Sequence, residues 1–149
     1  MNRLLLYSKE EWRDGPWKVE DDYVQLIEEI SGYPCFIRRL YHSGAWCGGV
    51  GIPPKHALYM SDKTEYTFKY IDVHGNVSYS GWDTREDQWV FPPQHYWWIG
   101  FDCMKDTDLC PKFINDESYN DGKIIYRTEQ YALDHAIFLA QQLMLMDSD

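Results

Sequence analysis

The sequence lacks the features that mark membrane proteins and disulfide-stabilised secreted domains. No apolar run reaches the roughly 18 to 20 residues that a membrane helix needs, and residues 1–7 do not have the layout of a signal peptide. The 4 cysteines form no CxxC pair, and a chain of 149 residues does not need disulfides to be stable. We therefore expect a cytoplasmic protein with reduced thiols and no membrane contact.

Basic residues are also scarce. The 14 lysines and arginines are outnumbered by 24 aspartates and glutamates, which gives a formal net charge of −10. This charge disfavours direct binding to nucleic acid, whose phosphates would be repelled, and favours a basic or neutral protein partner. With 44% hydrophobic residues the chain has enough apolar side chains for a core, so we expect one compact domain over residues 1–149.

Two segments have the apolar spacing of amphipathic helices. Between residues 18 and 30 apolar residues recur at steps of three and four, after Pro16 and before Gly32, which predicts an N-terminal helix. Near the other end, Thr128 is suited to cap a helix with one apolar stripe, made of Ala132, Ala136, Leu139, Ala140 and Leu143.

The middle of the chain has the composition of β-strands. Residues 35–41, 45–52 and 95–102 are rich in β-branched and aromatic residues, and residues 66–80 predict a hairpin with its turn at His74-Gly75-Asn76. These elements predict an α+β fold, with a mainly antiparallel sheet of about four to six strands packed against an N-terminal and a C-terminal helix. The order of the strands stays open.

Histidines and aspartates near the ends of these strands are the candidate catalytic or metal-binding residues. His56, His74 and Asp102 offer the imidazole and carboxylate ligands that Zn or Mn accepts, and His74 with Asp102 offers a general base and its orienting acid. Together they suit a metal-dependent hydrolase of nucleotides or phosphodiesters. Asp72, Asp106 and Asp108 lie near the same strand ends and belong to this group of candidates. In the alternative interpretation Asp72 and Asp102 cap turns, His74 is the first residue of a turn, and no cofactor is expected.

Other sites that the composition permits are less well supported. Cys47, Cys103 and Cys110 lack zinc-site spacing, and acidic neighbours oppose a nucleophilic pair of Cys103 with His74, so buried thiols are favoured. The glycines at 44, 48, 49 and 51 match no phosphate-loop pattern and indicate close backbone packing.

Aromatic and acidic side chains near loops are candidates for partner binding. Exposed aromatics anchor interfaces, and clustered carboxylates could attract the basic surface of a nucleic-acid enzyme by imitating a phosphate backbone. The partner-binding set comprises Trp82, Asp83, Glu86, Asp87, Trp89, Asp116, Glu117 and Asp121. A third alternative is a small-molecule binding module with a pocket lined by Trp46, Tyr79, Trp97 and Trp98.

Three motifs resemble a known family. The segments WCGGVGIP (46–53), DVHGNVSYS (72–80) and WWIGFDC (97–103) are similar to those of small uncharacterised proteins of bacteriophages and mobile elements. In that family a second glycine is expected where Asn76 stands, and a histidine where Met104-Lys105 stands, which weakens a metal site. The resemblance implies an accessory protein in the bacterial host cytoplasm that binds and inhibits a host component, such as a defence or nucleic-acid-handling enzyme.

Overall fold

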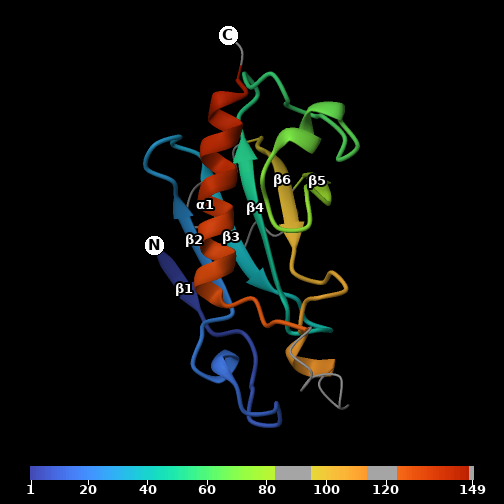
Figure 1. Cartoon of the computed structure of the whole chain (residues 1–149). Coiled ribbons are helices and arrows are strands. Elements are labelled where there is room, and N and C mark those ends of the chain that lie inside the picture. Colours follow the sequence, from blue (N-terminus) through green and yellow to red (C-terminus); the bar gives the residue numbers. More distant parts are fainter. Residues whose placement is uncertain (83–94, 114–123, 148–149) are drawn as a thin grey trace.

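A single antiparallel sheet with one helix across it forms the fold (Figure 1). The computed structural model describes residues 1–82, 95–113 and 124–147. The sheet has six strands in the order β1-β2-β3-β4-β6-β5. Their bounds are β1 Asn2–Leu4, β2 Tyr23–Ile27, β3 Pro34–Arg39, β4 Trp46–Ile52, β5 Tyr79–Gly81 and β6 Trp97–Asp102. None of the helices within the described ranges has the length and apolar character needed to cross a bilayer.

Helix α1, Glu129–Leu145, packs on β3 and β4 and confirms the predicted C-terminal helix. The Thr128 side chain caps it by accepting a hydrogen bond from the Tyr131 amide at 3.1 Å. The predicted apolar stripe is buried against the sheet, where it meets Val24, Ile37 and Ile99. The strands predicted at 35–41, 45–52 and 95–102 are confirmed as β3, β4 and β6, with the ends moved by one or two residues.

The predicted N-terminal helix over residues 18–30 is wrong. This segment follows a short 3-10 turn, Pro16–Lys18, and contains strand β2, which pairs along its whole length with β3. The apolar residues at the ends of the supposed stripe do not reach the core, since Val19 is 90% exposed and Ile30 is 66% exposed. Pairing with β3 and the burial of Asp22 thus override a spacing that would suit an amphipathic helix.

The predicted hairpin over residues 66–80 is confirmed at its turn and at the end of its second strand, where β5 lies, but β5 pairs with β6 instead of with the residues before the turn. The Asn76 amide donates to the Val73 carbonyl at 3.0 Å, and Gly75 has a φ of +66°. Before the turn, Tyr66–Tyr70 forms a 3-10 helix (η2) instead of a strand. Between η2 and the turn, backbone amides donate hydrogen bonds to side chains of α1; the Asp72 amide, for example, donates to Gln142 Oε1. The helix therefore supplies the hydrogen bonds that a paired strand would otherwise supply.

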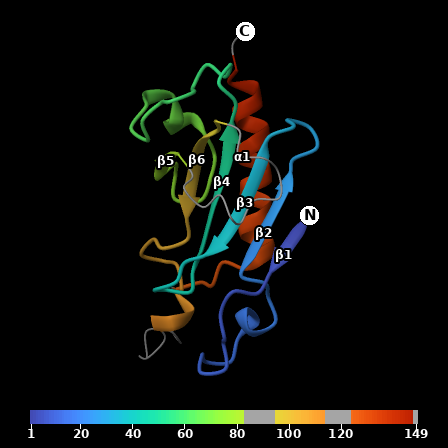
Figure 2. The same cartoon turned by 180° about the vertical axis from the view of Figure 1, so that it is seen from behind.

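Figure 2 shows the face of the sheet that is turned away from α1. This face has its own layer of aromatic side chains. Tyr23, Phe36 and Trp98 form a second buried cluster there. The register pairs Gly49 of β4 with Gly100 of β6, and a Cβ on Gly49 would lie 2.8 Å from Phe36 Cε1. The absence of side chains at these two positions lets aromatic rings lie directly on the strands, which shapes the groove described next.

Candidate functional site

A groove of about 500 Å³ lies where β4, β5 and β6 meet the turns at their ends. It is mainly apolar, and three residues at its rim, Tyr79, Trp82 and Met104, are between 44% and 47% exposed. We call it the sheet groove; its lining residues are Phe36, Leu40, Cys47, Gly48, Ser78, Tyr79, Trp82, Phe101, Asp102 and Met104. Volume and lining are those of a cavity that can bind a small ligand or one side chain of a partner.

Asp102 supplies the carboxylate of the sheet groove. Its Oδ1 accepts the Met104 amide at 3.0 Å, and its Oδ2 accepts the Ser78 hydroxyl at 3.0 Å. The Lys105 ammonium lies 3.5 Å from Oδ2, and both of these charged side chains are partly exposed. The stem of Lys105 lies over Gly75, where a Cβ would come within 2.4 Å of Lys105 Cε. The carboxylate is therefore fixed by two neutral donors and only loosely paired with a cation.

His74 belongs to a second polar group, on the side of the sheet that α1 covers. Its Nε2 lies 2.7 Å from Asp108 Oδ2, and its Nδ1 lies 2.7 Å from the Tyr131 hydroxyl. Asp108 also accepts the Arg127 Nε–H at 2.9 Å. The His135 Nδ1 accepts the His74 amide at 3.1 Å. We call these five residues the His74 cluster.

The hydrogen bonds of the His74 cluster fix the positions of its protons. Burial opposes ionisation of Asp108, but hydrogen bonds from His74 and Arg127 outweigh it and lower the pKa of this carboxyl. An ionised carboxylate only accepts, so His74 carries its hydrogen on Nε2 and accepts the phenol hydrogen of Tyr131 on Nδ1. Burial raises the pKa of Tyr131, which keeps that phenol protonated. Both ring nitrogens of His74 are thus engaged within the chain.

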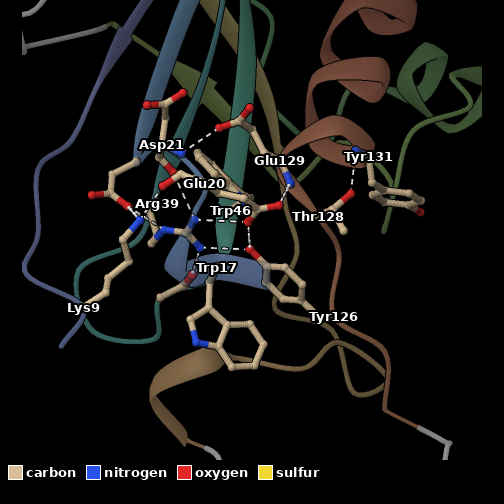
Figure 3. A network of polar contacts seen from close by, with 12 residues as sticks. Lys9, Trp17, Glu20, Asp21, Arg39, Trp46, Tyr126, Thr128, Glu129 and Tyr131 are labelled. Carbon is tan, nitrogen blue, oxygen red and sulfur yellow. Dashed lines mark hydrogen bonds and ion pairs between the residues drawn. The ribbon is translucent and has the colours of Figure 1, made fainter. Parts of the chain in front are cut away.

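A third polar group, the Arg39 network, is enclosed by protein (Figure 3). Asp22 and Arg39 are both fully buried. Asp22 Oδ1 accepts from Arg39 Nε and from Lys9 Nζ, each at 2.9 Å. Asp22 Oδ2 accepts the amides of Leu6 and Tyr7 at 2.8 and 3.0 Å. This carboxylate joins the N-terminal segment to the sheet.

All five N–H groups of Arg39 have acceptors. Besides Nε, its Nη1 donates to the Gly44 carbonyl and the Tyr126 hydroxyl. Its Nη2 donates to the Asp21 carbonyl and to Glu20. The guanidinium also lies 4.3 Å from the centre of the Trp46 ring. Because every donor is used and the group is shielded from water, the network is structural.

The predicted metal ligands do not come together. His56 is buried, with Nε2 2.6 Å from the Leu143 carbonyl and Nδ1 accepting the Leu58 amide. His74 instead contacts α1 at Tyr131 and His135, about two to three helical turns from Leu143. In the ranges that the structure describes, no three His, Cys, Asp or Glu side chains are placed to hold a metal ion. Asp102 follows the alternative interpretation and caps a turn.

The partner-binding set is described only at Trp82, whose ring packs edge-on against Tyr59 and Trp97. The other members lie outside the described residues: Asp83, Glu86, Asp87, Trp89, Asp116, Glu117 and Asp121.

The four aromatics of the predicted pocket are divided among different places. Trp46 is buried beside Arg39, and Trp97 donates its Nε1–H to the Ser61 carbonyl at 2.8 Å. Trp98 is buried with Phe36. Tyr79 lines the sheet groove. The prediction that these four side chains line one pocket is therefore wrong.

Of the cysteines predicted to be buried, Cys103 is buried, whereas Cys47 and Cys110 are only partly buried. All four are free, and Cys35 and Cys103 are buried. Burial raises the pKa of the Cys103 thiol, and the charge of Asp108 raises it further. A protonated thiol is a poor nucleophile, so Cys103 is unsuited to form a nucleophilic pair with His74.

Sequence analysis singled out His74 and Asp108 but missed their partners on α1. Tyr131 and His135 are four residues apart in a predicted helix, so they share a helix face. This spacing was a usable signal that α1 presents two polar rings together to the His74 turn. Arg127 had no such signal, because its contact depends on how the chain enters the helix.

Comparisons with known proteins leave the site to be interpreted from its geometry. No family model, curated protein or solved structure matches the chain.

Proposed function

We propose that this chain is a binding protein that holds an apolar group of a partner in the sheet groove, with Asp102 as the polar anchor. The observation that carries the proposal is the groove itself, which combines a mainly apolar lining, a partly exposed rim and one oriented carboxylate. Ligand sites usually have this composition, with few polar groups that fix the orientation of the ligand.

The backbone at the groove favours a preformed site. A Cβ on Gly100 would lie only 2.6 Å from the Gly48 carbonyl oxygen, so a side chain there would force the strands apart, and the Tyr79 ring packs over this position, with Cδ1 3.5 Å from where that Cβ would be. Tyr79 can therefore lie on β6 and form a wall of the groove. A wall supported by paired strands loses little entropy on binding.

The charge of the chain suggests the kind of partner. A net charge of −10 accelerates encounters with basic surfaces and slows encounters with acidic ones. A protein that resembles phage accessory proteins would meet such surfaces on a host protein, and inhibition of a host defence or nucleic-acid-handling enzyme is the specific form of this proposal.

A metal-dependent hydrolase is the weaker alternative. The contact between His74 and Asp108 favours it, because a carboxylate that orients an imidazole is a common acid–base arrangement. However, Tyr131 already occupies the other nitrogen of His74, and the described residues gather no set of three metal ligands. Binding through the sheet groove accounts for more of the geometry.

Selection from a random peptide library tests the proposed function. We expect the selected peptides to lose affinity for Cys47→Phe, which fills the groove, and for Tyr79→Ala, which removes a wall. The matched control is Val19→Phe, which adds the same ring at a position that is 90% exposed. Peptides that bind all variants equally, or a selection that yields no binder, would contradict the proposal.

A further inference from the structure

We infer that the sheet groove selects a primary ammonium on an aliphatic stem, as in a lysine side chain of the partner. This inference rests on the proposed function and names the chemistry of the ligand. Its central observation is that the chain already places a lysine of its own, Lys105, beside the Asp102 carboxylate. Lys105 thus occupies the position on Oδ2 that we assign to the incoming ammonium.

The contact that Lys105 makes is weak enough to be replaced. The distance from Nζ to Oδ2 is 3.5 Å, whereas charge-assisted N–H···O bonds are typically about 2.7–2.9 Å long. The side chains of Lys105 and Asp102 are 39% and 29% exposed, so water screens their attraction. An ammonium that arrives through the groove can approach the carboxylate more closely without breaking a strong ion pair.

The hydrogen bonds of Asp102 favour an ammonium. Ser78 donates to Oδ2 and Met104 donates to Oδ1, so each oxygen already uses one acceptor position on a donor from the chain. These two donors hold the carboxylate plane in place. A compact ammonium replaces the Lys105 ammonium on one oxygen, whereas a guanidinium binds best when both oxygens accept in parallel.

The lining suits the rest of a lysine side chain. Leu40 and Met104 offer apolar surface to the methylene groups, and Tyr79 offers an aromatic ring, whose face attracts cations. The net charge of −10 attracts a basic segment before the side chain enters the groove. The apolar walls, the one carboxylate and the negative net charge of the chain therefore all favour the same ligand.

The test is an amide NMR titration of the full chain with N-acetyl-lysine methylamide and with N-acetyl-norleucine methylamide, which lacks the amino group. We expect the lysine probe to shift the amides of Ser78, Tyr79 and Met104, and to bind about three- to tenfold more tightly than the norleucine probe. Asp102→Asn should remove this preference. Lys105→Met should strengthen binding of the lysine probe, because the internal competitor is gone. Asp106→Asn, an exposed carboxylate nearby, is the matched control and should change nothing.

The outcomes separate this inference from the proposed function. Equal binding of both probes at the groove, unchanged in Asp102→Asn, would overturn the ammonium assignment and leave the binding function standing. Tighter binding of the corresponding arginine derivative would overturn it as well. If neither probe moves any groove amide and the peptide selection also fails, the proposed function itself is wrong.

Discussion

The Arg39 network and the His74 cluster both surround a buried aspartate, yet they differ in what the aspartate binds. Asp22 and Asp108 both have a pKa below the ordinary value, since hydrogen bonds from basic partners and from backbone amides outweigh the burial that opposes ionisation. The side chain of neither carboxylate is exposed to water. In charge and burial the two centres are alike.

The difference lies in the partners. Asp22 binds an ammonium, from Lys9, and a guanidinium, from Arg39, and both are enclosed by protein. Asp108 binds Arg127, which is partly exposed, and the His74 imidazole, which lies beside a second imidazole, that of His135. The His74 cluster therefore contains a group, His135, whose lowered pKa makes stability depend on pH near neutrality, whereas the Arg39 network, in the part of the chain that the structure describes, contains no histidine.

Removal of the Arg39 guanidinium should have the largest effect on stability. Arg39→Leu leaves the carboxylates of Asp22 and Glu20 without their shared cation in a buried place. We expect the free energy of unfolding to fall by about 3–5 kcal/mol, measured by urea denaturation. Arg3→Leu, which breaks an exposed ion pair with Asp21, is the control and should cost less than about 1 kcal/mol. A similar decrease in the free energy of unfolding for both variants would mean that burial does not make the ion pairs of Arg39 more important than those of Arg3.

Neutralisation of Asp108 should cost less. Asp108→Asn keeps the shape of the side chain but weakens the bonds from His74 and Arg127. Because both partners reach water, we expect a loss of about 1–3 kcal/mol in the same measurement. Asp106→Asn provides the exposed control. A loss as large as that of Arg39→Leu would show that the His74 cluster is as structural as the Arg39 network.

Loss of the Tyr131 hydroxyl should have a smaller effect still. Tyr131→Phe removes one hydrogen bond to His74 Nδ1 and leaves the Asp108 contact in place. We expect a loss of about 0.5–1.5 kcal/mol, with the ring ¹⁵N spectrum still reporting a hydrogen on Nε2. Tyr66→Phe, at an exposed phenol, should change neither quantity. A spectrum with the hydrogen on Nδ1 would contradict the assignment in which the Asp108 carboxylate determines the tautomer of His74.

The pH dependence between neutrality and mild acid should be the subtlest difference. Burial is the largest cause that lowers the pKa of His135 below its ordinary value of 6.5, and the neighbouring His74 lowers it further. The unfolded chain therefore binds more protons in this range, so stability is complete above pH 6.5 and decreases as the pH falls towards the folded-state pKa.

Thermal unfolding from neutral to mildly acid pH measures this decrease. His135→Gln, whose side-chain oxygen can still accept the His74 amide, should remove part of the slope. Arg3→Leu, which breaks exposed ion pairs and leaves the histidines in place, is the control and should leave the slope unchanged. A slope identical in the wild type and His135→Gln would exclude His135 as the responsive group.

The sequence predicted the elements whose local signals agree with their packing. Strands β3, β4 and β6 are dense in apolar and aromatic residues, and α1 has both a cap and a stripe, so propensity and burial point to the same structure. The segment 18–30 failed because its apolar spacing suits a helix, while its burial is decided by β3, which follows it in the chain.

The candidate site was less predictable because it depends on strand order. Asp102 and Tyr79 were both singled out, but only the placement of β6 between β4 and β5 brings them to one groove. In the same way, His74 and Asp108 were grouped with His56 on chemical grounds. The spatial arrangement separates His56, which binds near the far end of α1.

The Arg39 network also sets the order in which the chain can fold during synthesis. Glu20 accepts a hydrogen bond from the Glu129 amide, which is 109 positions later in the chain. Arg39 donates to the Tyr126 hydroxyl, which is 87 positions later. At ribosomal speeds of about 5–20 residues per second, the interval from Glu20 to Glu129 lasts on the order of 10 s. During that time the guanidinium lacks its contact with Tyr126. The Arg39 network is therefore completed only after Tyr126 and the start of α1 have been synthesised. Until then the nascent chain must remain soluble without this network.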